Sequence, residues 1–333
     1  MSRTVITAAL LLAASISVKT YAVPEKRIPT EIVRHGNDLW FVAWTVDRVE
    51  KDALGMPKLH AFLGRLTTRG RFRITPAGPE HMPAFATHTP DGALWFTDAG
   101  RPVLWRIGKD GRITKVAAST AAQHVVYAAG DLWCSHPYSG SISRLGLDGS
   151  GKGGFSVPDE LPPPMTSLPP PPPGPRVASL AVGSDGAIWF PEPYRKRIGR
   201  LTAAGEMTFY PVPHALMPYS VIVAGPDGAL WYTTDENRLG RITTTGEISS
   251  VPIGFPAMRL TADSRGRVWY AHGSNSAGVI HRDGTRQELE VPKLRSIRSI
   301  VEGPDGAMWI ADETQALIAR IELADARVAP RIR

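Results

Sequence analysis

Short hydrophobic runs, each interrupted by a turn, repeat along the chain at a spacing of about forty residues. The clearest unit is AGPDGALWYTTDENRLGRITTTGEI, at Ala224–Ile248. It contains a Pro-Asp-Gly turn, an apolar run ending in Trp-Tyr, a polar loop, the run LGRI and a second turn at Gly246. Asp-Gly supplies the positive φ that a tight hairpin needs, and Trp, Tyr, Leu and Ile favour pleated, half-buried strands. The unit therefore predicts four short strands joined by turns.

A tryptophan ends the second predicted strand of each unit. Seven such residues occur: Trp40, Trp95, Trp133, Trp189, Trp231, Trp269 and Trp309. A four-stranded antiparallel unit with this period is typical of a β-propeller blade. One such sheet cannot bury both faces, so the blades must stack in a ring with each Trp between neighbours. We predict an all-β, seven-bladed β-propeller with four antiparallel strands per blade, and the Trp count disfavours a six-bladed lactonase-type propeller.

The N-terminus has the pattern of a secretory signal. Arg3 precedes an apolar run that ends in the triplet Thr20-Tyr21-Ala22. We expect residues 1–22 to be a signal peptide cleaved after Ala22, and residues 23–333 to form a single, secreted or periplasmic propeller domain. No later stretch is long and apolar enough to cross a bilayer, so no transmembrane span is expected.

The sequence leaves open which end of the chain closes the ring. Residues 24–34 are expected to provide an edge strand and then the innermost strand of the first blade. The C-terminal RVAPRIR is an equal candidate for the last outer strand. One of them must pair across the seam, because an open ring would expose unpaired strand edges.

Two insertions interrupt the repeat. The interval from Trp40 to the third-strand residue Leu63 is 23 residues, against nine in the fourth unit. The extra residues, 45–60, are charged, and we expect a loop or a short helix. The second insertion, 158–175, contains Pro169–Pro173, which favours a stiff polyproline II loop. This loop is a rigid connector or, alternatively, a docking arm for a protein partner.

The formal charge of +7 reflects a repeated position more than a basic surface. Six copies of the third predicted strand carry an arginine at one place: Arg65, Arg106, Arg144, Arg200, Arg241 and Arg320. We expect each to pair with a carboxylate or to stack on an aromatic ring between blades. No run of basic residues with interleaved aromatics occurs, so nucleic acid is not an expected partner.

The single cysteine, Cys134, follows Trp133 on a predicted strand. One cysteine forms no internal disulfide, so the fold must depend on its own core and on ring closure. We interpret Cys134 as a small buried apolar residue rather than as a catalytic thiol.

Topology indicates which face carries a functional site. In an antiparallel blade the start of the innermost strand and the end of the second strand share a rim, so both insertions rise from one face, and long loops usually carry function. Polar residues three or four positions beyond the tryptophans lie at this rim and include Asp98, His136, Glu192, Asp235, His272, Asp312 and Glu313. Such a ring could hold a divalent cation or polarise a carbonyl. Alternatively, these residues are polar only because they are solvated.

The phrases DGALWYT…NRLGRITTTGEI, DGAIWF…KRIGRLTAAGEM and DGALWFTD closely resemble the streptogramin B lyases, also called virginiamycin B lyases. The resemblance covers nearly all of the expected mature chain and implies a seven-bladed propeller. It also implies an activity, the linearisation of a cyclic depsipeptide antibiotic by elimination at its ester, with a divalent metal, usually Mg²⁺. The shared motifs belong mostly to the scaffold and are weakly specific for that activity.

Most of the family's catalytic positions are not matched. The resemblance implies a Pro-His at the start of the innermost strand in each of the last two blades, one His for the metal and one as general base. It also implies a Glu just before the second Pro-His and another four residues beyond the last Trp. Only the last is matched, by Glu313, whereas Met258, Arg298 and Ser296 stand at the other positions. Methionine is a poor Mg²⁺ ligand, and arginine cannot act as a base but suits a carboxylate or phosphate of a ligand.

These observations support three hypotheses. The preferred one is a small or peptidic ligand bound at the central face, lined by Arg298, Glu313, His272 and Asp312, without the elimination chemistry. The first alternative is a lyase or esterase-type hydrolase on a cyclic ester, with His272 as base, Glu313 as its orienter, Arg298 as electrophilic clamp and Mg²⁺ as the cofactor that the resemblance implies. The second alternative is a scaffold for protein partners. We expect a monomer.

Overall fold

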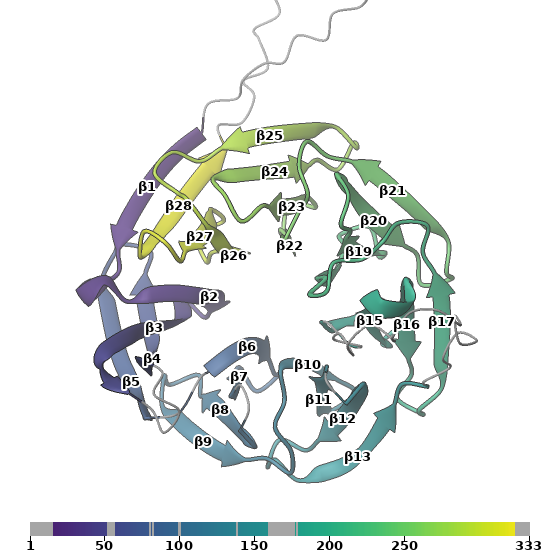
Figure 1. Cartoon of the computed structure of the whole chain (residues 1–333), viewed down its shortest axis with the longest axis horizontal. Coiled ribbons are helices and arrows are strands. Elements are labelled where there is room, and N and C mark those ends of the chain that lie inside the picture. Colours follow the sequence, from purple (N-terminus) through teal and green to yellow (C-terminus); the bar gives the residue numbers. More distant parts are fainter. Residues whose placement is uncertain are drawn as a thin grey trace, which may run out of the picture.

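A computed structural model of the chain describes residues 16–51, 57–79, 81, 83–98, 101–137, 139–158, 177 and 179–323. These residues form seven four-stranded antiparallel sheets, arranged as propeller blades around a central axis (Figure 1). The only helical elements in the described part are two 3-10 turns, η1 (Pro24–Lys26) and η2 (Pro193–Arg195). The prediction of seven blades is confirmed.

The first six blades run in chain order from the innermost to the outermost strand. Blade one comprises β2 (Ile28–His35), β3 (Asp38–Lys51), β4 (Pro57–Thr67) and β5 (Phe72–Pro79). Blade two comprises β6 (Pro83–His88), β7 (Leu94–Asp98), β8 (Val103–Ile107) and β9 (Ile113–Ala117). Blade three comprises β10 (His124–Ala128), β11 (Asp131–His136), β12 (Ser141–Leu145) and β13 (Gly151–Ser156).

The next three blades repeat this order. Blade four comprises β14 (Ala181–Val182), β15 (Ile188–Glu192), β16 (Arg197–Leu201) and β17 (Met207–Pro211). Blade five comprises β18 (Ile222–Ala224), β19 (Leu230–Thr233), β20 (Arg238–Ile242) and β21 (Ile248–Pro252). Blade six comprises β22 (Arg259–Ala262), β23 (Val268–Ala271), β24 (Ser276–Ile280) and β25 (Arg286–Glu290).

Blade seven is closed by the N-terminal part of the chain (Figure 1). It combines β26 (Ile297–Glu302), β27 (Met308–Asp312) and β28 (Leu317–Leu323) with an outermost strand β1 (Ile16–Ala22), which pairs antiparallel with β28. The N-terminal part of the chain therefore supplies the edge strand that closes the ring. This strand, β1, precedes residues 24–34, where the edge strand was expected; those residues form η1 and most of β2 instead. The C-terminal RVAPRIR lies outside the described residues.

The position of β1 bears on the expected signal peptide. Tyr21 stacks on Trp309 with 5.4 Å between the ring centroids. The outermost strands of blades three and four place Phe155 and Tyr210 on the tryptophans of their own blades in the same way. Cleavage after Ala22 would therefore remove a strand that blade seven uses.

The tryptophans lie between neighbouring blades, as predicted. Trp40 packs with Leu94 and Phe96 of blade two, and Trp309 packs with Ile32 of blade one. The other five tryptophans make the equivalent contact, one cluster at each blade interface. Fully burying one large apolar side chain stabilises a fold by roughly 1.5–3 kcal/mol. The core is thus a ring of seven interfaces, and the innermost strands line the central axis.

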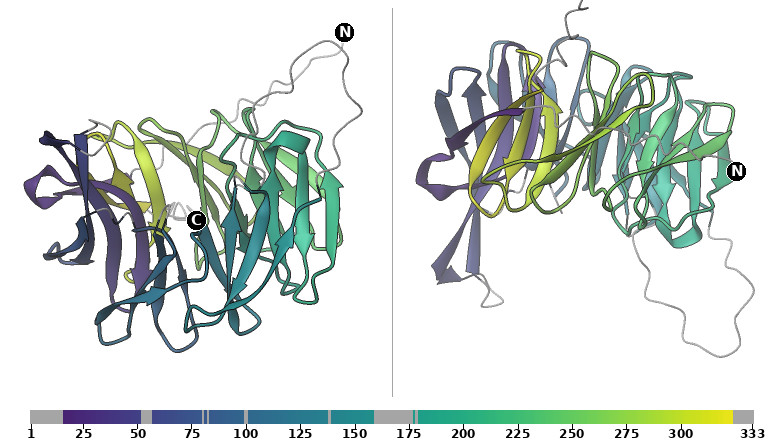
Figure 2. Two further views of the ribbon diagram at one scale, coloured as in Figure 1. Left: turned by 60° about the horizontal axis from the view of Figure 1, so that its bottom comes forward. Right: turned by 90° about the horizontal axis from the view of Figure 1, so that it is seen from above.

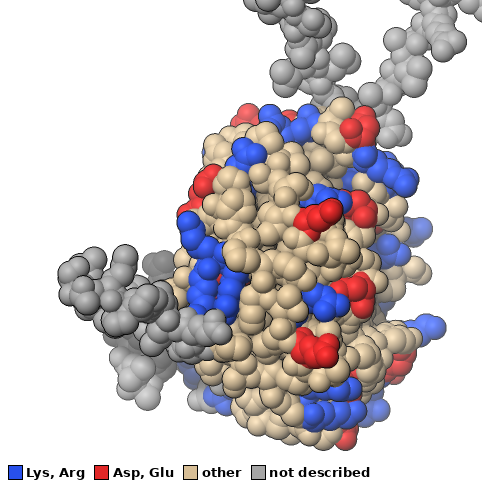
Figure 3. All heavy atoms as spheres, turned by 90° about the vertical axis from the view of Figure 1, so that its right-hand side faces the viewer, with Lys and Arg blue, Asp and Glu red and all other residues tan. Residues whose placement is uncertain are grey.

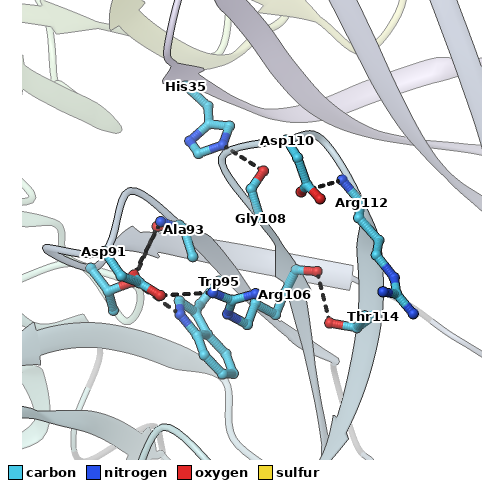
Figure 4. Close-up of polar contacts among 10 residues, drawn as sticks. His35, Asp91, Ala93, Trp95, Arg106, Gly108, Asp110, Arg112 and Thr114 are labelled. Carbon is cyan, nitrogen blue, oxygen red and sulfur yellow. Dashed lines mark hydrogen bonds and ion pairs between the residues drawn. The ribbon is translucent and has the colours of Figure 1, made fainter.

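The repeated arginines pair with a carboxylate, which confirms that prediction. The partner is the aspartate of the turn that precedes each Trp, in the pairs Arg65–Asp38, Arg106–Asp91, Arg144–Asp131, Arg200–Asp185, Arg241–Asp227 and Arg320–Asp305. In blade two the Arg106 guanidinium donates to Asp91 at 2.7 Å and lies 5.8 Å from the Trp95 ring (Figure 4). Hydrogen bonds from Thr89 and Arg106 lower the pKa of Asp91 to about 2. We call this arrangement the Asp–Arg clamp.

In blades one, four, five and six, the aromatic residue after the Trp faces a glycine on the third strand. Tyr232 pairs with Gly240, and a Cβ at Gly240 would overlap the Tyr232 ring. Blade three instead pairs two small residues, Cys134 and Ser143. Cys134 is fully buried, and burial raises the pKa of its thiol to about 12, so it is a small buried residue, as predicted.

The insertion in blade one corrects a prediction. Residues 45–60 were expected to form a loop or short helix, but β3 and β4 continue through most of this stretch and stay paired, as at Thr45–His60 and Asp47–Lys58. The hairpin projects beyond one face of the disc (Figure 2, right). Thr45 and Val46 supply the β-branched residues that favour a strand over a helix. The proline-rich stretch 158–175 lies almost wholly outside the described residues.

We predict that Gly240→Ala lowers the free energy of unfolding by about 1–3 kcal/mol, because the added methyl forces the Tyr232 ring to move. In a Tyr232→Cys background, which copies the small pair of blade three, the same substitution should cost much less. Urea unfolding of the two single variants and the double variant gives the coupling energy. Additive costs would contradict this packing.

Candidate functional site

Three neighbouring innermost strands are irregular at the rim from which the blade-one hairpin rises. The register of β2 shifts between Pro29 and Glu31, that of β26 shifts around Arg298, and that of β6 shifts after Pro83. A β-bulge bends its strand and changes the direction of a side chain, and bulges occur often beside active sites. The bulges belong to blades seven, one and two, so they mark one sector of the central axis. We call this sector the funnel.

Four charged side chains interact in the funnel: Glu31, Arg259, Arg298 and Glu313, here named the Glu–Arg cluster. The Arg298 Nε lies 3.6 Å from Glu313 Oε2. Arg259 donates to the carbonyl oxygen of Arg298 from Nε, and to that of Met258 from a terminal nitrogen at 2.7 Å. The backbone bonds fix the Arg259 side chain beside Arg298, so two guanidiniums lie close together.

The charges of the cluster depend on one another. Burial raises the pKa of Glu31 to about 7, although Arg259 and Arg298 both act to lower it. Burial also lowers the pKa of Arg259, with the neighbouring Arg298 acting in the same direction. Near neutral pH, Glu31 therefore exchanges a proton beside the guanidiniums of Arg259 and Arg298. This sector favours an anionic group.

The Mg²⁺ that the family resemblance implies does not fit the funnel. In the described part of the chain no group of three or more His, Cys, Asp or Glu side chains is placed to hold a metal ion. Two guanidiniums beside Glu31 and Glu313 would repel a divalent cation, and the thioether of Met258 is a poor ligand for it.

Three of the expected ring carboxylates are buried and hydrogen-bonded within their own blades. Asp312 is fully buried and accepts backbone N–H groups from Arg295, Ser296 and Gln315 at 2.6, 2.8 and 2.6 Å. It therefore shapes the loop from which Glu313 projects. The Ser296 hydroxyl in turn donates to Glu313 at 2.9 Å.

The carboxylates of blades two and four are similarly occupied. Asp98 accepts from Trp105 Nε1 at 2.9 Å and pairs with His81 Nδ1 at 2.5 Å. Glu192, only 1 % exposed, pairs with Arg197 and lies 3.2 Å from Arg195 Nε. Both carboxylates are therefore occupied by side chains of their own blades, in contacts that hold rim loops.

The remaining predicted residues are spread around the rim. His272 Nδ1 lies 3.2 Å from the Ser274 hydroxyl, and within the described contacts no hydrogen bond or ion pair joins His272 to Glu313. His136 bonds Ser143 at 2.7 Å, and burial lowers its pKa. Asp235 is exposed on blade five. Of the predicted site residues, the structure brings together Arg298 and Glu313.

Sequence reasoning missed two members of the cluster, Glu31 and Arg259. The predicted site residues came from the ends of the second strands and from the positions that the family resemblance implies. Met258 is one of these positions, and Arg259 is the residue directly after it. A usable signal existed, because charged residues are few on the innermost strands of the described structure and Glu31 and Arg259 are among them. The bulges that bring these side chains together leave no mark in the hydrophobic pattern.

Two cavities in the described part of the chain lie away from the cluster. One of about 550 Å³ is at the opposite end of the axis, lined by Arg34, His88 and Glu302. Its Glu302 carboxylate already accepts two hydrogen bonds from Ser264. Another, of about 430 Å³, lies between blades six and seven beside Trp269. The funnel is instead an open site, with the Arg298 side chain 46 % exposed.

Charge elsewhere on the surface is mixed. Basic and acidic side chains are interspersed on the side of the disc that carries β17 and β21 (Figure 3). No helix in the described part of the chain is long and apolar enough to cross a membrane.

Comparison with known proteins identifies the type of propeller. The model of the Virginiamycin B lyase family matches residues 165–329. A streptogramin B lyase structure shares 25% identity over 93% of this chain and 98% of its own, with a TM-score of 0.74. Virginiamycin B lyase from Staphylococcus aureus shares 23% over 93% and 100%, also with a TM-score of 0.74. A catalytically inactive variant of that enzyme with quinupristin shares 22% over the same shares of the two chains.

A search of curated proteins finds no match. Other propellers share the architecture alone, such as the WD40 domain of Doa1 at 10% identity and a TM-score of 0.67. The chain is therefore a virginiamycin B lyase-like β-propeller.

We predict that Glu31→Gln raises the thermal stability at pH 8 and that the gain shrinks toward pH 4.5. A carboxyl whose pKa rises on folding from 4.5 to about 7 stabilises the fold fully below 4.5, and this contribution is lost as the pH rises through 7. The glutamine amide at position 31 does not titrate, so the variant does not lose this stability as the pH rises. Thermal unfolding between pH 4.5 and 8 measures the difference, with the exposed Glu206→Gln as the control for charge; a gain that does not vary with pH would contradict it.

Proposed function

We propose that this chain is an exported propeller that binds the anionic group of a small or peptidic ligand at the Glu–Arg cluster, without the elimination chemistry of its relatives. The supporting observation is the incomplete pairing of Arg298. Its Nε lies 3.6 Å from Glu313, whereas Asp–Arg clamps such as Arg200–Asp185 close to 2.7 Å. The guanidinium is 46 % exposed and keeps donors for a ligand.

A carboxylate is the group that such a site suits best. A guanidinium presents paired N–H donors that match the two oxygens of a carboxylate, and such charge-assisted hydrogen bonds are the stronger ones. Arg259 adds positive charge behind Arg298. Peptides with a free C-terminus and small organic acids are therefore the expected ligand class.

A lyase or esterase-type hydrolase is the second candidate, favoured by one observation. Glu31 titrates near neutrality, as a general base must, and it lies in the funnel. His272, the base expected from the sequence, bonds Ser274 instead of Glu313. In this alternative Glu31 takes the proton next to a carbonyl that Arg298 polarises.

We predict that Arg298→Ala weakens the binding of N-acetyl dipeptide acids by about 10–100-fold, because a hydrogen bond to a charged group contributes about 1.5–3 kcal/mol. The matching C-terminal amides should bind weakly to both proteins. Isothermal titration calorimetry measures the affinities. Arg34→Ala, at the other mouth of the same axis, is the matched control because it removes the same charge from an exposed side chain.

The same preparation separates the two candidates. Turnover of quinupristin, the compound bound to the related lyase variant, would establish the enzyme if Glu31→Gln abolished it. Equal binding of acids and amides, unaffected by Arg298→Ala, would contradict the proposed carboxylate site. Docking of a protein partner through residues 158–175, and a monomeric state, remain predictions.

We also propose that export leaves β1 in the mature protein. The Tyr21 side chain lies between Trp309 of blade seven and Gly70 of blade one. The seam between these blades is therefore closed both by the pairing of β1 and by the packing of the Tyr21 aromatic ring. The small-x-small triplet Ala13-Ala14-Ser15 directly precedes β1 and offers a signal peptidase site there.

We predict that the secreted or periplasmic protein begins at Ile16. Intact-mass measurement of the exported protein would detect this terminus, and Tyr21→Ala should lower its melting temperature because blade seven loses a packed ring. A mature chain that begins at Val23 would contradict the assignment.

A further inference from the structure

We propose that Glu31 binds the ligand in its protonated form, donating its carboxyl hydrogen to one oxygen of the anionic group while Arg298 holds the other. Ligand binding then takes up a proton. The inference rests on the proposed function and specifies how that site selects its ligand.

A hydrogen bond between blades fixes Glu31 relative to Arg298. The backbone N–H of Ile32, the next residue after Glu31, donates to the hydroxyl of Ser299, the next residue after Arg298, at 3.2 Å. This bond is buried and joins β2 to β26. Ser299 directly follows the bulge of β26, and Glu31 directly follows the bulge of β2, so the two strands present Glu31 and Arg298 from neighbouring positions on the axis. One ligand group can therefore touch both.

The charged groups around Glu31 come from the blade-six and blade-seven side. Arg259 on β22 and Arg298 on β26 both act on Glu31, and Glu313, which follows β27, acts on Arg259. Before β2, Arg27 is paired with Glu25 at 2.6 Å.

On the other side of β2, the ionisable residue of β6 is His88. It lies at the far end of that strand and stacks on His35 with 5.6 Å between the ring centroids. Of the Glu–Arg cluster, Glu31 is the member whose pKa burial brings to about 7.

An anion that binds Arg298 changes the protonation of Glu31. An ionised Glu31 would repel the ligand's charge, whereas the protonated carboxyl supplies a donor to it. Binding therefore raises the proton affinity of Glu31, which in the free protein is half-protonated near pH 7. By linkage, affinity is highest below pH 7 and falls toward tenfold per pH unit above it, until the pKa of the bound state is reached.

Calorimetry with N-acetyl dipeptide acids tests this between pH 6 and 9, in buffers that differ in ionisation enthalpy. These ligands stay ionised over the whole range, so proton uptake reports on the protein. We expect uptake to approach one proton per ligand above pH 7, with about 50-fold weaker binding at pH 9 than at pH 7. Glu206→Gln, at an exposed position on blade four, should leave both effects unchanged.

Two variants distinguish the effect of the Glu31 proton from the effect of the other contacts of its side chain. Glu31→Gln keeps a donor, so it should bind as tightly at pH 9 as the native chain does at pH 6, without proton uptake. Glu31→Ala should bind more weakly at every pH, also without uptake. Arg298-dependent binding with pH-independent affinity, or uptake that persists in Glu31→Gln, would overturn this inference and leave the proposed function standing. Absence of Arg298-dependent binding at every pH would overturn both.

Discussion

The contact on which this molecule depends is a tryptophan held between two blades. Each of the seven indoles packs against the next blade, and in most blades an Asp–Arg clamp holds the strand behind it. In blade seven Asp305 accepts from Trp309 Nε1 at 3.0 Å and from Arg320 Nε at 2.6 Å. Asp305 thus orients both the Trp309 indole and the Arg320 guanidinium beside it. Because stability is built interface by interface, the axis needs no packed core of its own.

Because the blade interfaces carry the stability and the axis does not, the strands at the site can be irregular while the rest of the propeller is regular. Side chains on the innermost strands divide between the blade interfaces, as at Ile32 and Ile300, and the axis. The bulged positions Thr30 and Arg298 belong to no interface cluster. Bulges in β2 and β26 are therefore tolerated, and the buried bond from Ile32 to Ser299 restores the contact between these strands. The cluster of Glu31, Arg259 and Arg298 occupies positions that the repeat leaves free to vary.

The same division sets what the sequence could predict. Blade number, the position of Trp309 and the pairing of Arg320 follow from local rules that recur in every unit, so they were predictable. Glu31 and Arg298 approach each other across 267 residues through two bulges, and no periodic pattern encodes such an approach. The blade-one hairpin was missed for a related reason. Charges suggested a loop, but pairing between two long strands satisfies the backbone of both beyond the face of the disc.

The substitutions at the family positions change the chemistry in a consistent direction. A guanidinium supplies fixed positive charge and directional donors, but it offers no open coordination position and accepts no proton near neutral pH. With Arg298 where the resemblance implies a histidine, and Met258 at the other such position, the proposed role of the funnel is to hold an anion without activating it. The titrating group then comes from another blade, because Glu31 is the carboxyl that burial brings near neutrality. In this proposal the site exchanges a proton with its ligand through Glu31, and the charge that attracts the ligand stays fixed on Arg298.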